Sequence, residues 1–161
     1  MTKKEDYSSE EWKLLLEIPP LVGLAVMMAG KSGFGTMKEA WAMTRGVLDA
    51  KDGYEGNELI QSLVDARIKD REHSQVEQLK SPYRGQSPEE VLKSALELCN
   101  EVKSVLGTKA TEDEAAGFVD WTITVGEKVA NAAKEGGFFS QGDKVSEEEA
   151  FVIGEVKKVF A

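Results

Sequence analysis

The sequence holds a single cysteine and a single histidine among its 161 residues. A lone cysteine forms no internal disulfide and suits a reducing compartment. Cys99 also follows Leu96 and Leu98 in an apolar helical register, which predicts a buried thiol. Zinc sites and di-iron bundles need several His or Cys ligands, and a hydrolytic triad would have only His73 as its base. The sequence therefore predicts a protein that is not an enzyme and needs no cofactor.

Positive charge is also scarce. The chain has 20 Lys and Arg against 29 Asp and Glu, a formal net charge of −9. Binding a phosphate backbone requires clustered basic residues that release counterions, whereas the basic residues here are scattered among acids. We therefore expect no nucleic-acid partner.

Long apolar runs are missing as well. The most apolar stretch, Leu14 to Ala29, contains Glu17, Pro19 and Pro20, and a bilayer span needs about 20 predominantly apolar residues. The N-terminal residues lack the apolar region of a secretory signal. We expect a cytoplasmic protein without a transmembrane segment, in which this stretch is a core helix; a membrane-surface anchor is the alternative. Because proline disrupts a helix interior, the helix should break at Pro19–Pro20 and restart there.

Helix start signals recur along the chain. In a capping box, a Ser or Thr side chain and a Glu three residues later each bind a free backbone N–H. Such boxes begin at Ser8, Thr36, Ser87, Thr111 and Ser146, and Asn57 is a further cap. Glycine-rich breaks fall at 30–35, 52–56, 81–86, 107 and 136–142. Apolar residues at helical spacing predict helices over 37–50, 57–80, 88–106 and 147–160.

Residues 119–125 alternate between apolar and polar, as a strand would. A helical stripe that continues from Phe118 to Ala133 favours a helix instead, because no second strand is present to pair with. The chain is thus expected to be a single all-α domain over 1–161, with six or seven helices packed as hairpins and a disordered tail over 1–7. Its predicted core contains Trp12, Leu15, Leu16, Val22, Val26, Trp41, Leu48, Leu63, Leu92, Leu96, Phe118, Val125, Val129, Phe151 and Val156, with Trp12, Trp41 and Trp121 anchoring the hairpins.

A faint internal repeat is present. Trp12 precedes the Thr36 box by 24 residues, and Trp121 precedes the Ser146 box by 25. Both intervals contain a glycine-rich loop. One hypothesis is an internal duplication with a pseudo-two-fold axis; the alternative is that helical hairpins converge on such patterns.

Acidic residues gather after the last glycine-rich loop, residues 136–142. Asp143, Glu147 and Glu148 offer the carboxylate oxygens that hard divalent cations prefer. The same residues also fit a solvated loop and a helix N-terminus, where negative charge is favourable. The sequence leaves both interpretations open.

The helix–loop–helix pattern over residues 125–160, with GDKVSEEE (142–149) at its centre, resembles the tellurite-resistance TerB-like domains. That resemblance implies an all-helical fold and metal binding through acidic residues. With its segments EEWKLLLEIPPLVGLAV, SGFGTMKEA, NELI and AAKEGGFFSQGDKVSEEEA, the whole chain looks closer to an uncharacterised family of small prokaryotic all-helical proteins. This second resemblance implies a fold and no activity.

Three phenylalanines lie in the glycine-rich loops: Phe34, Phe138 and Phe139. Exposed aromatic side chains on such loops serve as docking anchors, although they could instead pack back against the core. The leading prediction is therefore a non-enzymatic module that binds a protein partner or a second copy of itself. The alternatives are a divalent-cation-binding domain and a carrier of small hydrophobic ligands, since methionines cluster near the proline pair: Met27, Met28, Met37 and Met43.

Overall fold

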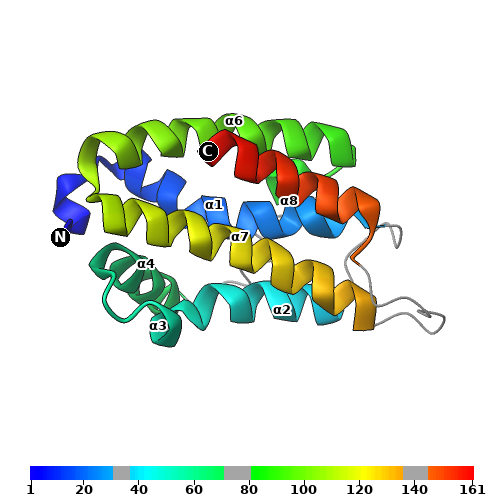
Figure 1. Ribbon diagram of the computed structural model, residues 1–161, viewed down its shortest axis with the longest axis horizontal. Coiled ribbons are helices and arrows are strands. Elements are labelled where there is room, and N and C mark those ends of the chain that lie inside the picture. The colour runs from blue at the N-terminus through cyan, green and yellow to red at the C-terminus, as the bar shows by residue number, and fades with distance from the viewer. Residues whose placement is uncertain (31–36, 71–80, 136–144) are drawn as a thin grey trace.

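The computed structural model describes residues 1–30, 37–70, 81–135 and 145–161. Within these ranges the fold is all-α and contains no strand (Figure 1). The α-helices are α1 (Ser9–Ala29), α2 (Met37–Leu48), α3 (Ala50–Gly53), α4 (Glu58–Lys69), α6 (Pro88–Lys109), α7 (Glu112–Glu135) and α8 (Glu147–Phe160), and short 3-10 turns occur at η1 (Lys4–Asp6) and η2 (Ser81–Tyr83). The predicted single all-α domain is confirmed. The predicted break at Gly107 is wrong, because α6 continues to Lys109.

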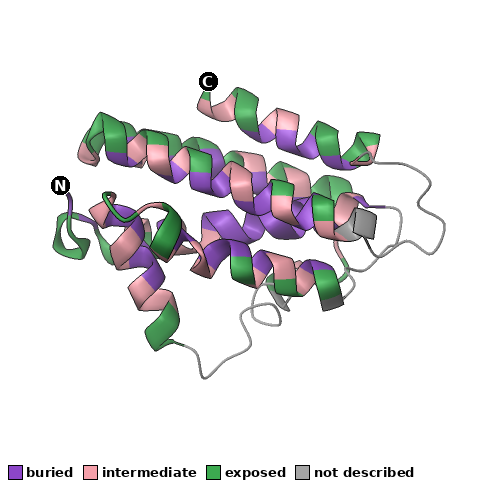
Figure 2. Ribbon diagram, turned by 60° about the horizontal axis from the view of Figure 1, so that its bottom comes forward, coloured by how far each residue is buried: buried purple, intermediate pink, exposed green. Residues whose placement is uncertain are grey.

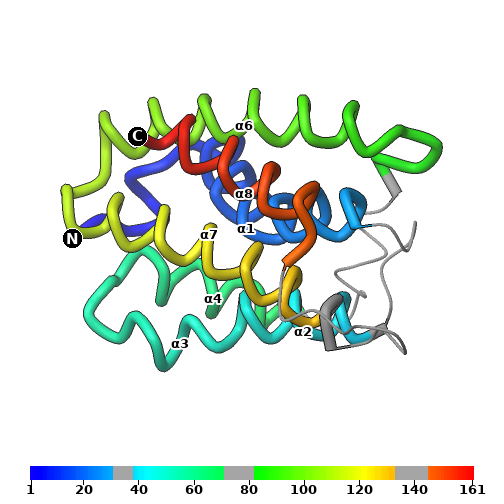
Figure 3. Tube along the Cα trace, turned by 45° about the vertical axis from the view of Figure 1, so that its right-hand side comes forward, coloured from blue at the N-terminus to red at the C-terminus, as the bar shows by residue number. Residues whose placement is uncertain are grey.

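Helix α1 lies at the centre of the bundle. It packs most extensively against α7, α6 and α8, and its C-terminal half is enclosed on all sides, with every residue from Ile18 to Met27 buried (Figures 2 and 3). Its length and its mean hydropathy of 1.5 would also allow a membrane span, but 67% of that window is buried inside the protein. The expected core helix is therefore found, and the absence of a transmembrane segment stays a prediction.

The predicted break at Pro19–Pro20 is wrong, because α1 runs without interruption from Ser9 to Ala29. Proline at position 20 has no N–H, so the carbonyl of Leu16 loses its normal intrahelical donor. The guanidinium of Arg67, on α4, donates a hydrogen bond to this carbonyl. A side chain 51 residues away in the sequence thus replaces the missing backbone donor.

The helix starts follow the local signals in the sequence. Ser8, Ser87 and Ser146 each accept a hydrogen bond from the backbone of a glutamate three residues later, and that glutamate accepts one in return. Thr111 and Glu114 form the same arrangement at the start of α7. The Asn57 side chain accepts from the N–H of Ile60 at 3.0 Å. These predicted caps are confirmed; the box at Thr36 begins outside the described residues.

Two of the first seven residues, Thr2 and Tyr7, are packed against the bundle, and the other five are exposed. The Thr2 N–H donates to Oε1 of Glu114 at 2.8 Å, and the Thr2 hydroxyl lies 3.0 Å from the Tyr7 hydroxyl. The Tyr7 ring is buried beside Trp12, with 5.9 Å between ring centroids. Thr2 and Tyr7 therefore connect this polar segment to the bundle, and the disordered tail over 1–7 stays a prediction.

Helix α7 includes residues 119–125, so the predicted helix is confirmed there. It contributes buried aromatic rings to the core: Phe118 and Trp121 pack edge to face with 5.8 Å between centroids. Helix α2 packs along α7, and α8 packs along α1. In the hypothetical duplication, α1 corresponds to α7 and α2 corresponds to α8, so the contact between α2 and α7 corresponds to the contact between α8 and α1. The duplication stays a hypothesis.

Candidate functional site

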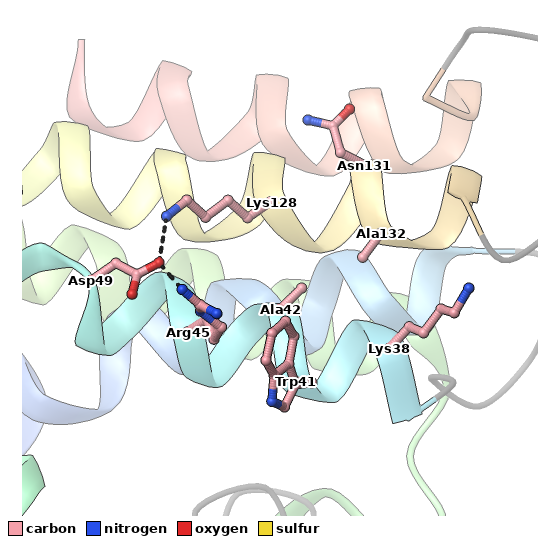
Figure 4. Close-up of a pocket in the computed structure, with 8 residues that line it drawn as sticks. All are labelled: Lys38, Trp41, Ala42, Arg45, Asp49, Lys128, Asn131 and Ala132. Atoms are coloured by element: carbon pink, nitrogen blue, oxygen red, sulfur yellow. Dashed lines mark hydrogen bonds and ion pairs between the residues drawn. The ribbon is translucent and has the colours of Figure 1, made fainter.

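A surface groove lies between α2 and α7 (Figure 4). We call it the Trp41 groove. Its volume is about 670 Å³. It is lined by Lys38, Trp41, Ala42, Arg45 and Asp49 on or just after α2, and by Lys128, Asn131 and Ala132 on α7.

Trp41 stands on the outer face of α2, with 63% of its surface exposed. The expectation that it belongs to the core is therefore wrong. Glu39 and Met43 are buried, and residues that lie two apart in a helix point in nearly opposite directions, about 200° apart. Glu39 and Met43 therefore define the side of α2 that faces the bundle, and the indole ring of Trp41 points toward solvent.

Close packing of α2 on α7 gives the groove a firm floor. A Cβ added at Gly46 would lie 3.4 Å from the Cα of Val125 and 3.3 Å from Cδ of Lys128. The indole N–H of Trp121 donates to the Gly46 carbonyl at 3.2 Å. A side chain at position 46 would require its neighbours to move by a few tenths of an ångström, so glycine suits this close approach of the two helices.

The groove is positively charged although the chain as a whole is acidic. The Arg45 guanidinium lies 4.8 Å from the centroid of the Trp41 ring, within the range of a cation–π contact. Oδ2 of Asp49 is 3.7 Å from Nε of Arg45 and 3.4 Å from Nζ of Lys128. Together with Lys38, three cationic side chains and one carboxylate line the groove. These ion pairs are partly exposed, and such pairs add little to stability. The pair with Asp49 does restrain the Arg45 side chain that contacts the indole.

A second exposed aromatic ring, Phe151, lies on α8 and is 59% exposed. Its predicted core position is wrong for the same reason as that of Trp41: Glu149 and Ile153, two residues to either side, are buried. Phe151 borders a shallower groove of about 310 Å³. We call this surface the Phe151 face; it is lined by Ala29, Pro88, Glu89, Leu92, Glu147, Glu148, Phe151 and Val152. Its charged residues are all acidic.

The structure locates only part of the predicted site residues. Glu147 and Glu148 are exposed in the first turn of α8 and belong to the Phe151 face. Asp143 lies outside the described residues, as do Phe34, Phe138 and Phe139. Within the described ranges, no group of three or more His, Cys, Asp or Glu side chains is arranged to hold a metal ion. The predicted cation site and the three phenylalanine anchors stay predictions.

Two titratable side chains among the described residues, Cys99 and Tyr54, have strongly raised pKa values. Burial raises the pKa of the Cys99 thiol to about 12, so the predicted buried cysteine is confirmed. Burial and a hydrogen bond to Asp120 raise the pKa of Tyr54 to about 12. Neither side chain provides an ionised nucleophile at pH 7.

Comparison with known proteins adds no relative. No family model, no curated protein and no solved structure matches the chain. The resemblances to the TerB-like domains and to the small helical family therefore stay predictions.

Proposed function

We propose that this protein is a non-enzymatic interaction module, and that its Trp41 groove binds an acidic segment of a partner protein. The observation that carries the proposal is a largely exposed tryptophan in contact with Arg45, in a groove also lined by Lys38 and Lys128, on a chain with a net charge of −9. Trp and Arg are the residue types most enriched among the side chains that dominate binding energy. Here they are already in contact, so docking requires little reorganisation of the pair.

The groove also indicates the kind of segment that fits. It runs between two helices, and amphipathic helices commonly dock in such grooves. An apolar side chain of the partner would cover the Trp41 ring, which is favourable because apolar surface leaves water. Carboxylates beside that side chain would face Lys38, Arg45 and Lys128. Complementary charge of this kind increases the association rate and selects the partner.

The proposal is tested with a synthetic helical peptide that carries three glutamates around a single phenylalanine. A fluorophore on the peptide reports binding by anisotropy. We expect saturable binding to the full chain, lost when the peptide phenylalanine is replaced by alanine or its glutamates by lysine. Trp41→Ala should weaken binding about 30-fold or more, as expected for a central aromatic anchor.

Two charge reversals distinguish the contribution of the groove to peptide binding from the contribution of the overall charge of the chain. Lys38→Glu changes the groove, whereas Lys13→Glu makes the same change at a side chain that is 76% exposed on α1. Lys38 lies in the first turn of α2, where a glutamate favours the helix, so the fold should tolerate the change. We expect Lys38→Glu to weaken binding and Lys13→Glu to leave it nearly unchanged. Equal effects of the two variants would contradict a localised site.

The indole fluorescence gives an independent measurement. Trp12 and Trp121 are buried, at 6% and 1% exposure, whereas Trp41 is 63% exposed. Acrylamide should therefore quench Trp41 selectively, and bound peptide should protect it. Unchanged quenching at saturating peptide would show that the peptide binds elsewhere.

A further inference from the structure

We infer that the acidic segment bound by the Trp41 groove is the Phe151 face of a second copy of this chain. This inference rests on the proposed function, since it names the partner of the same groove. The contact would join two different surfaces, so copies would associate head to tail.

The charges of the two surfaces are complementary. The Trp41 groove is lined by Lys38, Arg45 and Lys128 together with the indole, and Arg45 contacts the ring. The Phe151 face presents three carboxylates around a phenyl ring, from Glu89, Glu147 and Glu148. Trp41 and Phe151 are also the two exposed aromatic side chains among the large hydrophobic residues described as exposed. Each surface therefore has the composition that the other would bind.

The helix that carries Phe151 is also of a kind that could bind in a groove between two helices. Helix α8 is a 14-residue helix (Glu147–Phe160) whose first turn is acidic. Its inner side, with Val152, Ile153 and Val156, is already buried against the bundle. Phe151, Glu147 and Glu148 are exposed and face outward. The partner would therefore offer a preformed helix, and no folding cost accompanies binding.

The two surfaces are placed so that one copy can use both at once. No residue lines both of them. In Figure 1, α2 lies on one side of α7, while α8 and α6 lie on the other. A single chain therefore does not bring its own two surfaces together. Contacts between different surfaces give rings when the rotation closes and open chains of copies when it does not.

The net charge of −9 opposes any close contact between copies, since like charges repel. The contact proposed here places the acidic Phe151 face against a local excess of cations, so this repulsion is offset at the interface. Random orientations lack that compensation. Electrostatics thus selects the head-to-tail arrangement over contacts between two Phe151 faces.

Mixing two variants tests this directional contact. Trp41→Ala removes the groove anchor and keeps the Phe151 face, while Phe151→Ala does the reverse. In sedimentation velocity over a concentration series, the wild-type chain should form species larger than a dimer, or closed rings. Each variant alone should lose association about 30-fold or more. The equimolar mixture should form dimers and nothing larger, because only one productive contact per pair remains.

Ile68→Ala is the matched control. Ile68 is 36% exposed and lines neither surface, so this variant should associate like the wild type. Circular dichroism and thermal melts check that each variant keeps its fold. We expect that it does, because Trp41 and Phe151 are both largely exposed and their removal leaves the core intact.

Three results would overturn the inference: Phe151→Ala associating like the wild type, the mixture staying monomeric, or a wild-type chain that stays monomeric at every concentration. In the last case, the acidic peptide separates the two proposals. If the peptide still binds the Trp41 groove, the module has a different acidic partner and only the second copy is excluded. If the peptide also fails to bind, both proposals are wrong.

Discussion

Replacing Arg67 with methionine should destabilise the fold by removing a hydrogen-bond donor that Pro20 makes necessary. Methionine keeps most of the apolar stem and deletes the guanidinium. The Leu16 carbonyl, to which Arg67 donates, would then have no N–H at position 20 to replace it. A hydrogen bond that involves a charged group contributes about 1.5–3 kcal/mol, so we expect a loss of about 2 kcal/mol in unfolding free energy.

The decisive comparison is the same substitution in a Pro20→Ala background. Alanine restores the backbone N–H, which can donate to the Leu16 carbonyl across one helical turn. Arg67→Met should therefore cost less there, with a coupling of about 1–2 kcal/mol between positions 20 and 67. The pKa of Arg67 is lowered by burial, against the opposing effect of nearby carboxylates, yet an arginine stays protonated. Its hydrogen bond should accordingly persist at all pH values where the protein is folded.

Urea unfolding of the four chains, followed by circular dichroism, measures the cycle. The wild-type comparison should also appear in the melting temperature, which falls by about 4–8 °C for a loss of 2 kcal/mol in a chain of this size. Arg67→Lys, which keeps a charged donor, should recover part of the stability. If Arg67→Met costs the same with proline and with alanine at position 20, the guanidinium does not serve the orphaned carbonyl, and the explanation of the unbroken helix fails.

Three further predictions concern stability and reactivity. Cys99 should not react with a thiol reagent in the folded chain, because burial raises its pKa to about 12, and should react fully once urea unfolds it. Gly117→Ala should lower the unfolding free energy by about 1 kcal/mol, because the new Cβ would lie 2.4 Å from Nδ2 of Asn57, the cap of α4. Gly107→Ala should raise it by about 0.4–1 kcal/mol, because nothing lies within 4 Å of the new Cβ there. A Gly107 variant less stable than the Gly117 variant would contradict the packing. Burial by itself would raise the pKa of Glu114, but hydrogen bonds from two threonines outweigh it, and the pKa is lowered from 4.5. The stabilisation is therefore present above pH 4.5 and is lost as the pH falls through the folded-state pKa; Glu114→Gln should flatten this part of a pH series of urea unfolding curves.

Local chemistry made most helix starts predictable. A capping box needs only residues that lie within one turn of each other, so Ser8, Ser87 and Ser146 could be identified without knowledge of the fold. The helical conformation of residues 119–125 was predictable because the apolar stripe that starts at Phe118 continues past Val129, and because the sequence offers no second strand to pair with. These features depend on spacing along the chain, which the sequence contains in full.

The candidate site was not predictable in the same way. Periodicity assigned Trp41 and Phe151 to the core because large aromatic residues are usually buried. Their exposure depends on Glu39 and Glu149, which are buried at 0% and 3% exposure and rotate the inward face of each helix. The only signal available was that each aromatic residue follows the glutamate of a capping box by two positions, which is half a turn away from it.

The sequence alone thus specified an acidic all-α chain, the positions at which its helices begin, and the burial of Cys99, because these depend on composition and on contacts within one helical turn. The tertiary structure decided whether α1 continues through Pro19–Pro20, which way Trp41 and Phe151 point, and where a cationic groove forms on an acidic protein. Each of these depends on residues far apart in the chain: Arg67 reaches Leu16, and Lys128 of α7 shares Asp49 with Arg45 of α2. Local periodicity carries no information about such contacts, because they form only when the helices pack.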